Sequence, residues 1–278
     1  MPELAEIQDV VKLALREDIG AGDLTASLIP VSSQSLATVI SRQAAIICGI
    51  DWFNEVFRQI DPSIRIDWQV ADGDELKIDQ ILCTLQGSSR SLLTAERSAL
   101  NFLQTLSGTA TTTRDFVARL GGDSQCILLD TRKTLPCLRN AQKYAVTCGG
   151  GTNHRRGLYD GILLKENHIL AAGSIKTALQ QATERYPNML IEIEVESLSE
   201  LQQAISAGCR RILLDNMSLC DLSAAVKLSA GRAQLEASGG VNIETVAEIA
   251  STGVDFISVG ELSKHIQAID LSMRFLTK

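Results

Sequence analysis

The chain has 278 residues, of which 26 are Lys or Arg and 33 are Asp or Glu, so its formal net charge is −7. Hydrophobic residues make up 45% of the chain, enough to build a core, and this excludes a disordered protein. The acidic balance disfavours general nucleic-acid binding, because most of the surface would repel a phosphate backbone. This length fits two ordinary domains or one α/β barrel with an appendage.

The charge is uneven along the chain. Residues 131–168 contain seven Lys or Arg residues but only two acidic residues, and they also hold His154 and His168. We call this stretch the basic segment. A positive region in an acidic protein indicates a small anionic ligand rather than a polymer.

Targeting signals and cysteine usage indicate the compartment. No apolar run approaches the ~20 residues that a bilayer span requires, and residues 1–18 are acidic and amphipathic, unlike a signal or transit peptide. The seven cysteines form no C-x-x-C pair, which predicts free thiols in a reducing cytoplasm. A catalytic cysteine or a zinc site is the alternative, with Cys137 and Cys148 as candidates because they lie in the basic segment.

The N-terminal part of the chain predicts an α+β domain of about 110 residues. Apolar residues recur at helical spacing over 3–17, and a turn-like stretch follows at 20–25. A helix is also predicted from about 92 to 106. Between them, short β-type runs are separated by turn signals, at 36–41, 45–48, 64–69 and 81–85.

From about residue 126 the pattern changes to alternating strands and helices. Helical patterns separate the later strands, at 175–185, 198–207, 219–228 and 243–251. Six apolar runs predict strands, at 127–129, 161–164, 190–195, 211–214, 234–237 and 256–259, with 151–155 as a candidate seventh. This βα repeat predicts a shortened or open barrel, whose active site lies at the carboxyl ends of the strands.

Acidic residues lie on or at the end of two predicted strands. Side chains alternate faces along a strand, so Glu192, Glu194 and Glu196 share one face. On the inner face of a barrel they need cations, a metal or ligand hydroxyls, whereas on an edge strand they would simply be solvated. Asp215 ends the next strand, where it is either a helix N-cap or a partner for Glu194. Such a carboxylate pair suits Mg²⁺ or ribose hydroxyls.

Small residues follow the last two strands. Ser238-Gly239-Gly240 and Ser258-Val259-Gly260 each lead towards a helix N-terminus. Backbone N–H groups in such loops bind phosphate without a cation, and phosphate sites follow the final strands of many barrels. Ordinary turns are the alternative reading of both loops.

The basic segment places its charges at the ends of separate predicted elements: Arg132, Lys133, His154, Arg155 and Lys165. Arg side chains bind carboxylates through two parallel hydrogen bonds, so these groups suit a di-anion together with phosphates. A surface salt-bridge patch is the alternative, but few acidic partners lie nearby. His154 is a candidate proton donor.

The chain closely resembles the quinolinate phosphoribosyltransferase family, also called nicotinate-nucleotide pyrophosphorylase (carboxylating). The matching motifs run in order over nearly the whole chain: 15–25 (LREDIGAGDLT), 96–101 (ERSALN), 107–111 (SGTAT), 130–134 (DTRKT), 143–146 (KYAV), 149–155 (GGGTNHR), 164–168 (LKENH), 192–195 (EIEV), 214–216 (LDN) and 238–240 (SGG). A collinear set of this kind is far more specific than any one motif.

The resemblance implies an α/β fold with two domains. An N-terminal α+β sandwich would span 1–110 and be joined by 266–278, and an incomplete barrel of about seven strands would span 111–265. It also implies a homodimer, or a multiple of dimers, with shared active sites. The implied reaction joins quinolinate to 5-phosphoribosyl-1-pyrophosphate and releases CO₂ and pyrophosphate, giving nicotinate mononucleotide on the route to NAD.

The resemblance also implies roles for individual residues. Arg132, Lys133, His154, Arg155 and Lys165 would hold the quinolinate carboxylates and nearby phosphates, and Arg97 would come from the partner subunit. Glu194 and Asp215 would hold ribose hydroxyls and Mg²⁺, while Ser238, Gly239, Gly240, Ser258 and Gly260 would hold the 5′-phosphate. Lys133, His154, Glu194 and Asp215 are the candidate catalytic groups.

The chain departs from the family pattern at two loops. Leu135-Pro136-Cys137 stands where the family usually has Thr-Pro-Gly, and 260–265 reads GELSKH where the family usually has GALTHS. Two other functions remain: a related phosphoribosyltransferase-like protein of molybdate-transport operons, and a non-catalytic phosphosugar-binding protein. The complete set of predicted quinolinate-binding Arg, Lys and His residues favours the quinolinate enzyme.

Overall fold

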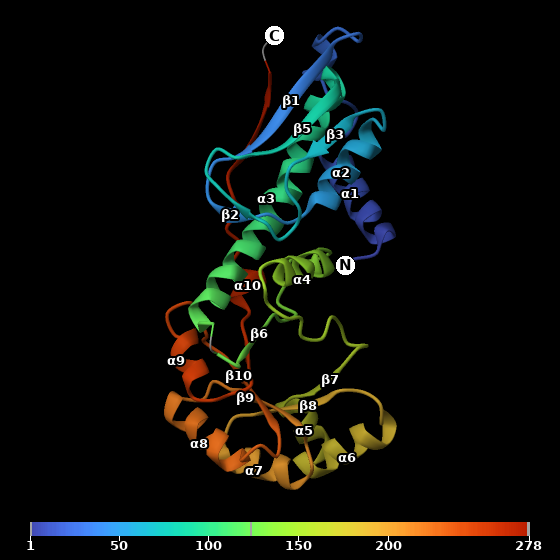
Figure 1. Ribbon diagram of the computed structural model, residues 1–278. Coiled ribbons are helices and arrows are strands. Elements are labelled where there is room, and N and C mark those ends of the chain that lie inside the picture. The colour runs from blue at the N-terminus through green and yellow to red at the C-terminus, as the bar shows by residue number, and fades with distance from the viewer. Residues whose placement is uncertain (1, 123, 277–278) are drawn as a thin grey trace. The chain divides into compact units, whose positions relative to one another are not determined.

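The computed structural model describes residues 2–122 and 124–276 and divides them into two compact units (Figure 1). The first unit comprises 2–114, 135–150 and 265–276, and the second comprises the remainder. We predicted that 111–265 would form one continuous barrel domain, but 135–150 belongs to the first unit. The reason is that this stretch forms the helix α4 (Arg139–Cys148), whose Ala141 and Ala145 are buried in the core of the first unit.

An antiparallel sheet organises the first unit. Its strand order is β12-β1-β5-β3, and a separate two-stranded ribbon pairs β2 with β4. The C-terminal strand β12 pairs along β1, with Val39 opposite Met273. The strands are β1 (Gln34–Ser41), β2 (Ala45–Ile46), β3 (Arg65–Trp68), β4 (Glu75–Leu76), β5 (Ile81–Ser88) and β12 (Leu271–Phe275).

Helices supply the rest of the core of the first unit. The helix α1 (Leu4–Ile19) follows the predicted 3–17, whereas α3 (Ser89–Leu120) is much longer than the predicted 92–106. The sequence analysis did not predict α2 (Ile50–Ile60), which buries Trp52, Phe53, Val56 and Phe57. Their spacing places all four on one helical face, but the surrounding β-type runs obscured this signal. A short 3₁₀ helix occupies Ala26–Leu28.

A parallel sheet organises the second unit. Its six strands follow the order β6-β11-β10-β9-β8-β7 within the described residues, which confirms the predicted α/β class with an incomplete barrel. Each predicted strand run is present, as β6 (Ile127–Leu129), β7 (Ile162–Leu164), β8 (Ile191–Val195), β9 (Arg211–Asp215), β10 (Gln234–Ser238) and β11 (Phe256–Ser258).

Helices follow these strands, and α6, α7 and α8 lie side by side along the sheet (Figure 1). Serine side chains begin all three: Ser174, Ser197 and Ser218 each accept a hydrogen bond from a backbone N–H in the first turn. The helices of this unit are α5 (Glu166–Ala172), α6 (Ile175–Arg185), α7 (Leu198–Ser206), α8 (Leu219–Ser229), α9 (Val246–Ser251) and α10 (Glu261–Lys264).

The candidate seventh strand at 151–155 is wrong, because only Thr152 forms a parallel bridge there, to Leu129 of β6. After Thr152, the backbone hydrogen-bonds to a side chain instead of to a neighbouring strand. Asp130 Oδ1 accepts a hydrogen bond from the His154 backbone N–H at 2.9 Å, so this N–H does not pair with a neighbouring strand. Across residues 2–122 and 124–276, no helix is long and apolar enough to cross a membrane.

Candidate active site

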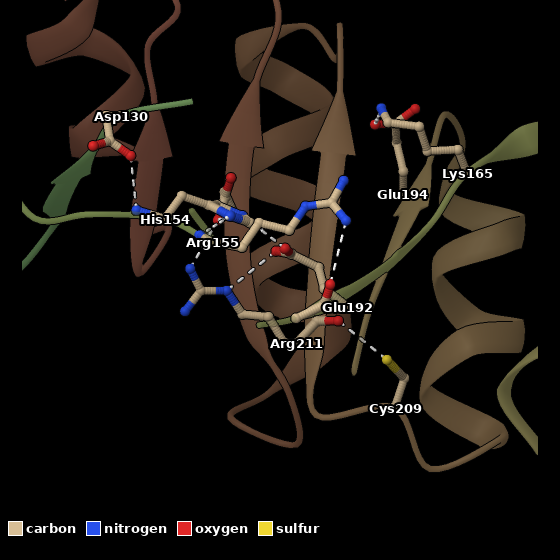
Figure 2. A network of polar contacts seen from close by, with 10 residues as sticks. Asp130, His154, Arg155, Lys165, Glu192, Glu194, Cys209 and Arg211 are labelled. Atoms are coloured by element: carbon tan, nitrogen blue, oxygen red, sulfur yellow. Dashed lines mark hydrogen bonds and ion pairs between the residues drawn. The ribbon is translucent and has the colours of Figure 1, made fainter. Parts of the chain in front are cut away.

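The carboxyl ends of all six parallel strands line one pocket of about 420 Å³. The lining includes residues at or just after the end of every strand: Asp130, Lys165, Glu194, Asp215, Ser238 and Ser258. This is the position that a barrel uses for its active site, because loops of independent sequence can converge there on a rigid sheet. Figure 2 shows Lys165 and Glu194 meeting at one side of this region, with Glu192 and Arg211 deeper along the strands.

Most of the predicted site residues meet in this pocket. Eleven of the thirteen line it: Arg132, Lys133, His154, Arg155, Lys165, Glu194, Asp215, Ser238, Gly239, Gly240 and Ser258. Gly260 does not line the pocket but packs beside Lys133, because a Cβ atom built on Gly260 would lie 3.2 Å from Lys133 Cδ. Arg97 is exposed on α3 in the first unit. The sequence analysis missed six lining residues: Asp130, Thr131, Leu163, Leu213, Asn216 and Glu236.

Cationic side chains come to the pocket from three separate segments. Burial and the nearby Arg132 guanidinium both lower the pKa of Arg155, which places two positive charges close together. The Lys165 ammonium contacts Glu194 Oε2, and Lys133 is exposed. Like charges held near one another in a cleft attract an anion with more than one negative group.

Asp130 holds the loop that carries His154. This carboxylate is fully buried, and it accepts the His154 backbone N–H through Oδ1 and the Asn153 side-chain amide through Oδ2, at 2.9 and 2.7 Å. A carboxylate that accepts two hydrogen bonds fixes the backbone that donates them. The position of Asp130 in the DTRKT motif at 130–134 was the only sequence signal for this role.

A buried ionic cluster adjoins the pocket and comprises His154 and Glu236, which also line the pocket, together with Glu192 and Arg211, which do not. Glu192 Oε2 is 2.8 Å from His154 Nε2, and Glu192 Oε1 is 3.2 Å from Arg211 Nε. A second guanidinium nitrogen of Arg211 lies 2.8 Å from Glu236 Oε2. The Arg211 guanidinium also stacks over the Phe256 ring at 3.3 Å. Both carboxylates are almost completely buried, at 1% and 0% exposure.

The two buried carboxylates have opposite pKa shifts. Burial raises the pKa of Glu236, and the nearby Glu192 charge adds to this effect. Burial also opposes ionisation of Glu192, but the hydrogen bond and charge of His154 and the charge of Arg211 outweigh it and lower the pKa of Glu192. These opposite shifts favour one negative charge over two in this pair, which reduces the cost of burying it beside Arg211.

Both ring nitrogens of His154 have protein partners. The Arg155 backbone N–H donates to His154 Nδ1 at 2.7 Å, and Nε2 faces Glu192. An Nδ1 that accepts leaves the ring proton on Nε2. Burial opposes protonation of the imidazole, but the adjacent Glu192 and Glu236 outweigh it and raise the pKa of His154. This geometry favours a positioning role for His154 over proton donation to a ligand.

Glu194 and Asp215 are the carboxylates whose chemistry fits Mg²⁺. They lie at the ends of the adjacent strands β8 and β9 and line the pocket, and hard oxygen donors of this kind suit Mg²⁺. The trio His154, Glu192 and Glu236 also brings three ligand atoms within 4.8 Å of one another. Arg211 contacts both of those carboxylates, so a metal ion there would meet a guanidinium.

The loop after β10 offers backbone groups to the pocket. Gly239 and Gly240 adopt φ of +91° and +63°, which residues with a Cβ rarely do. A Cβ on Gly239 would lie 2.2 Å from Asn216 Oδ1, so only glycine fits this approach. Consecutive N–H groups in a loop of this kind bind anions.

Comparisons with known proteins identify a family and a fold. The model of the quinolinate phosphoribosyl transferase N-terminal domain matches residues 23–107, and that of the C-terminal domain matches 109–274. A probable nicotinate-nucleotide pyrophosphorylase (carboxylating) from Bacillus subtilis strain 168 is 40% identical over 258 residues, covering 92% of this chain and 89% of that protein. A quinolinate phosphoribosyltransferase (decarboxylating) 1 from Nicotiana glauca is 38% identical, with 98% and 83% covered.

A solved structure shows the same fold. The nicotinate-nucleotide pyrophosphorylase from Francisella tularensis superposes with a TM-score of 0.97 at 45% sequence identity. The match covers 99% of this chain and 98% of that one.

Proposed function

Because the chain belongs to the quinolinate phosphoribosyltransferase family, we propose that it transfers the phosphoribosyl group of 5-phosphoribosyl-1-pyrophosphate to quinolinate with decarboxylation. The products are nicotinate mononucleotide, CO₂ and pyrophosphate, as in NAD biosynthesis. One observation carries the proposal. A single pocket gathers four cationic side chains, two partly exposed carboxylates and a glycine loop at the ends of one sheet.

Each part of the pocket matches a part of the two substrates. Arg132, Lys133, Arg155 and Lys165 provide donors for the two quinolinate carboxylates and for phosphate oxygens, with His154 holding the Arg155 backbone. Glu194 and Asp215 suit ribose hydroxyls and Mg²⁺. The backbone of Ser238, Gly239 and Gly240 suits the 5′-phosphate, with Ser258 beside it and Gly260 in the next loop.

The proposed chemistry depends on charge. The bond between ribose C1 and the pyrophosphate oxygen breaks and leaves an oxocarbenium-like centre, which the pyridine nitrogen captures. Bound Mg²⁺ would neutralise charge on the pyrophosphate leaving group, and the basic side chains stabilise the same charge. When the 2-carboxylate leaves as CO₂, the bonding electron pair stays on the ring carbon that carried it, and the adjacent positive pyridinium nitrogen stabilises this carbanion. Water or Lys133 returns a proton to the ring carbon. Holding both anions in one pocket supplies much of the rate gain.

One assay separates the three functions considered for this chain. The protein is incubated with quinolinate, 5-phosphoribosyl-1-pyrophosphate and Mg²⁺, and nicotinate mononucleotide and CO₂ are measured together. Equal amounts of both products are expected. Binding of the phosphosugar without turnover would favour a non-catalytic binding protein. Absence of product with quinolinate, but turnover with another acceptor, would favour the relative from molybdate-transport operons.

We also propose a homodimer in which Arg97 completes the site of a second subunit. Arg97 is exposed on α3, so it is available to another chain. Mixing Arg97→Ala protein with Glu194→Gln protein should restore roughly one quarter of wild-type activity, because half of the dimers are mixed and each mixed dimer has one intact site. If the mixture remains as inactive as its components, the shared site is excluded.

A further inference from the structure

Asn216 has a backbone conformation that is uncommon for a residue with a side chain. It directly follows β9, lines the pocket and has a φ of +54°. Asparagine tolerates the left-handed region better than most residues, but a structure retains such a residue only where its surroundings hold it. The contacts of its side chain therefore need an explanation, and the LDN motif at 214–216 gave the only sequence signal for them.

The side chain of Asn216 joins two strand ends. Its Nδ2 donates to Asp215 Oδ2 at 2.8 Å. Its Oδ1 lies so close to the Gly239 backbone that a Cβ atom built on Gly239 would be only 2.2 Å from this oxygen. Its backbone N–H donates to the Ser238 carbonyl oxygen at 2.9 Å. One residue thus contacts both the carboxylate at the end of β9 and the glycine loop after β10.

We infer that Asn216 is a positioning residue that holds the Asp215 carboxylate and the Ser238–Gly240 loop in one arrangement, and so sets the affinity for 5-phosphoribosyl-1-pyrophosphate but not for quinolinate. The inference rests on the proposed function, which assigns Asp215 and the loop to the phosphosugar. An amide suits this role because its neutral N–H donor orients a carboxylate and leaves its negative charge available. An ammonium group would neutralise that charge.

The substitution Asn216→Asp provides the sharpest test. Aspartate matches asparagine in shape and also tolerates a positive φ, so the backbone is retained. It replaces the N–H donor with a carboxylate facing Asp215. Loss of a residue that orients a ligating group typically costs 10- to 100-fold in affinity. We expect a loss of about that size for 5-phosphoribosyl-1-pyrophosphate with Mg²⁺ in titration calorimetry, with the quinolinate dissociation constant and the melting temperature unchanged.

Two further variants separate the side chain from the backbone. Asn216→Gly removes the amide but suits the left-handed φ, so it should also weaken phosphosugar binding and leave the melting temperature unchanged. Ala230→Gly is the matched control, because Ala230 has a φ of +47° at the end of α8, away from the pocket lining. It should change neither affinity.

The outcomes are distinct. Wild-type affinity for the phosphosugar in both Asn216 variants would overturn the inference. Equal losses of phosphosugar and quinolinate binding, together with a lower melting temperature, would also overturn it, because they indicate a general structural role. Failure of the proposed function would appear differently, as wild-type protein that forms no nicotinate mononucleotide.

Discussion

Two carboxylates on the strand β8, Glu192 and Glu194, share one face of the sheet but have very different surroundings. Glu192 is 1% exposed, and both of its oxygens are held, one by His154 and the other by Arg211. The side chain of Glu194 is 14% exposed and contacts Lys165, which is 47% exposed. Glu192 therefore belongs to the buried ionic cluster, whereas Glu194, two residues closer to the carboxyl end of the same strand, lines the pocket.

This difference indicates how one strand serves both folding and ligand binding. Buried charges that are paired cost a great deal when a partner is lost, whereas a partly exposed pair contributes little to stability and can rearrange around a ligand. We therefore expect substitution of Arg211, which does not line the pocket, to lower stability, and substitution of Arg132 or Glu194, which line it, to lower activity at unchanged stability. Four predictions test this division.

The largest effect should follow Arg211→Met. This change leaves Glu192 and Glu236 buried without their shared cation, and breaking a buried pair costs about 3–5 kcal/mol. Urea unfolding measures this loss of free energy. Arg210→Met is the matched control, because Arg210 is exposed, and its cost should stay below about 1 kcal/mol. Similar losses in the two variants would contradict the role of the cluster.

Arg132→Ala should abolish quinolinate binding and leave the fold intact. Removing one partner of a desolvated charge pair costs about 2–5 kcal/mol, which corresponds to roughly 30- to 5,000-fold in kcat/KM. Steady-state kinetics with varied quinolinate and a melting curve check both halves of the prediction. Arg156→Ala, an exposed change in the same basic segment, should be nearly silent. A near-normal kcat/KM for Arg132→Ala would refute its assignment.

Glu194→Gln should lower kcat/KM for 5-phosphoribosyl-1-pyrophosphate by about 10- to 100-fold, by analogy with changes around metal sites. Its stability should fall by less than about 1 kcal/mol, because its Lys165 partner is half exposed. Kinetics at several Mg²⁺ concentrations test the first part, and urea unfolding tests the second. Glu196→Gln, an exposed position directly after β8, serves as the control. A large stability loss would place Glu194 with the buried cluster.

The smallest effect should be a difference between the wild type and Glu236→Gln in how the free energy of unfolding depends on pH. Burial and Glu192 raise the pKa of Glu236 above its usual value of 4.5, so the native protein keeps a proton that the unfolded chain loses. The stability that this proton contributes is complete below about pH 4.5 and falls as pH rises through the raised pKa, by at most about 1.4 kcal/mol per pH unit.

Glutamine cannot titrate but can still accept from Arg211, so Glu236→Gln should lack this decline. Unfolding free energies of both proteins across pH 5 to 9, in steps of about 1 unit, measure the difference. The exposed Glu244→Gln should follow the wild type. Parallel pH profiles for wild type and Glu236→Gln would show that Glu236 is already ionised in the native state.

Local pattern predicted much of the second unit. Short apolar runs predicted all six parallel strands because a strand buried on both faces leaves a continuous apolar signal. The helix α6 (Ile175–Arg185) was predicted to the residue, and in the structure Ser174 is its N-cap. The pattern failed at α2 and α4, which are short helices among β-type and basic stretches. Packing against the core of the first unit decides their conformation.

The sequence by itself determined the α/β class, the family and most of the residues that line the pocket, because strand ends and their polar side chains are local features. Only the tertiary structure decided what each charge contacts. The sequence shows Glu192, Glu194 and Glu236 as similar acidic residues on strands. Their surroundings make the first a buried partner of Arg211 and His154, the second a pocket carboxylate beside Lys165, and the third a buried acid whose pKa is raised. Burial and pairing arise from residues distant in the chain, and they control both charge state and role.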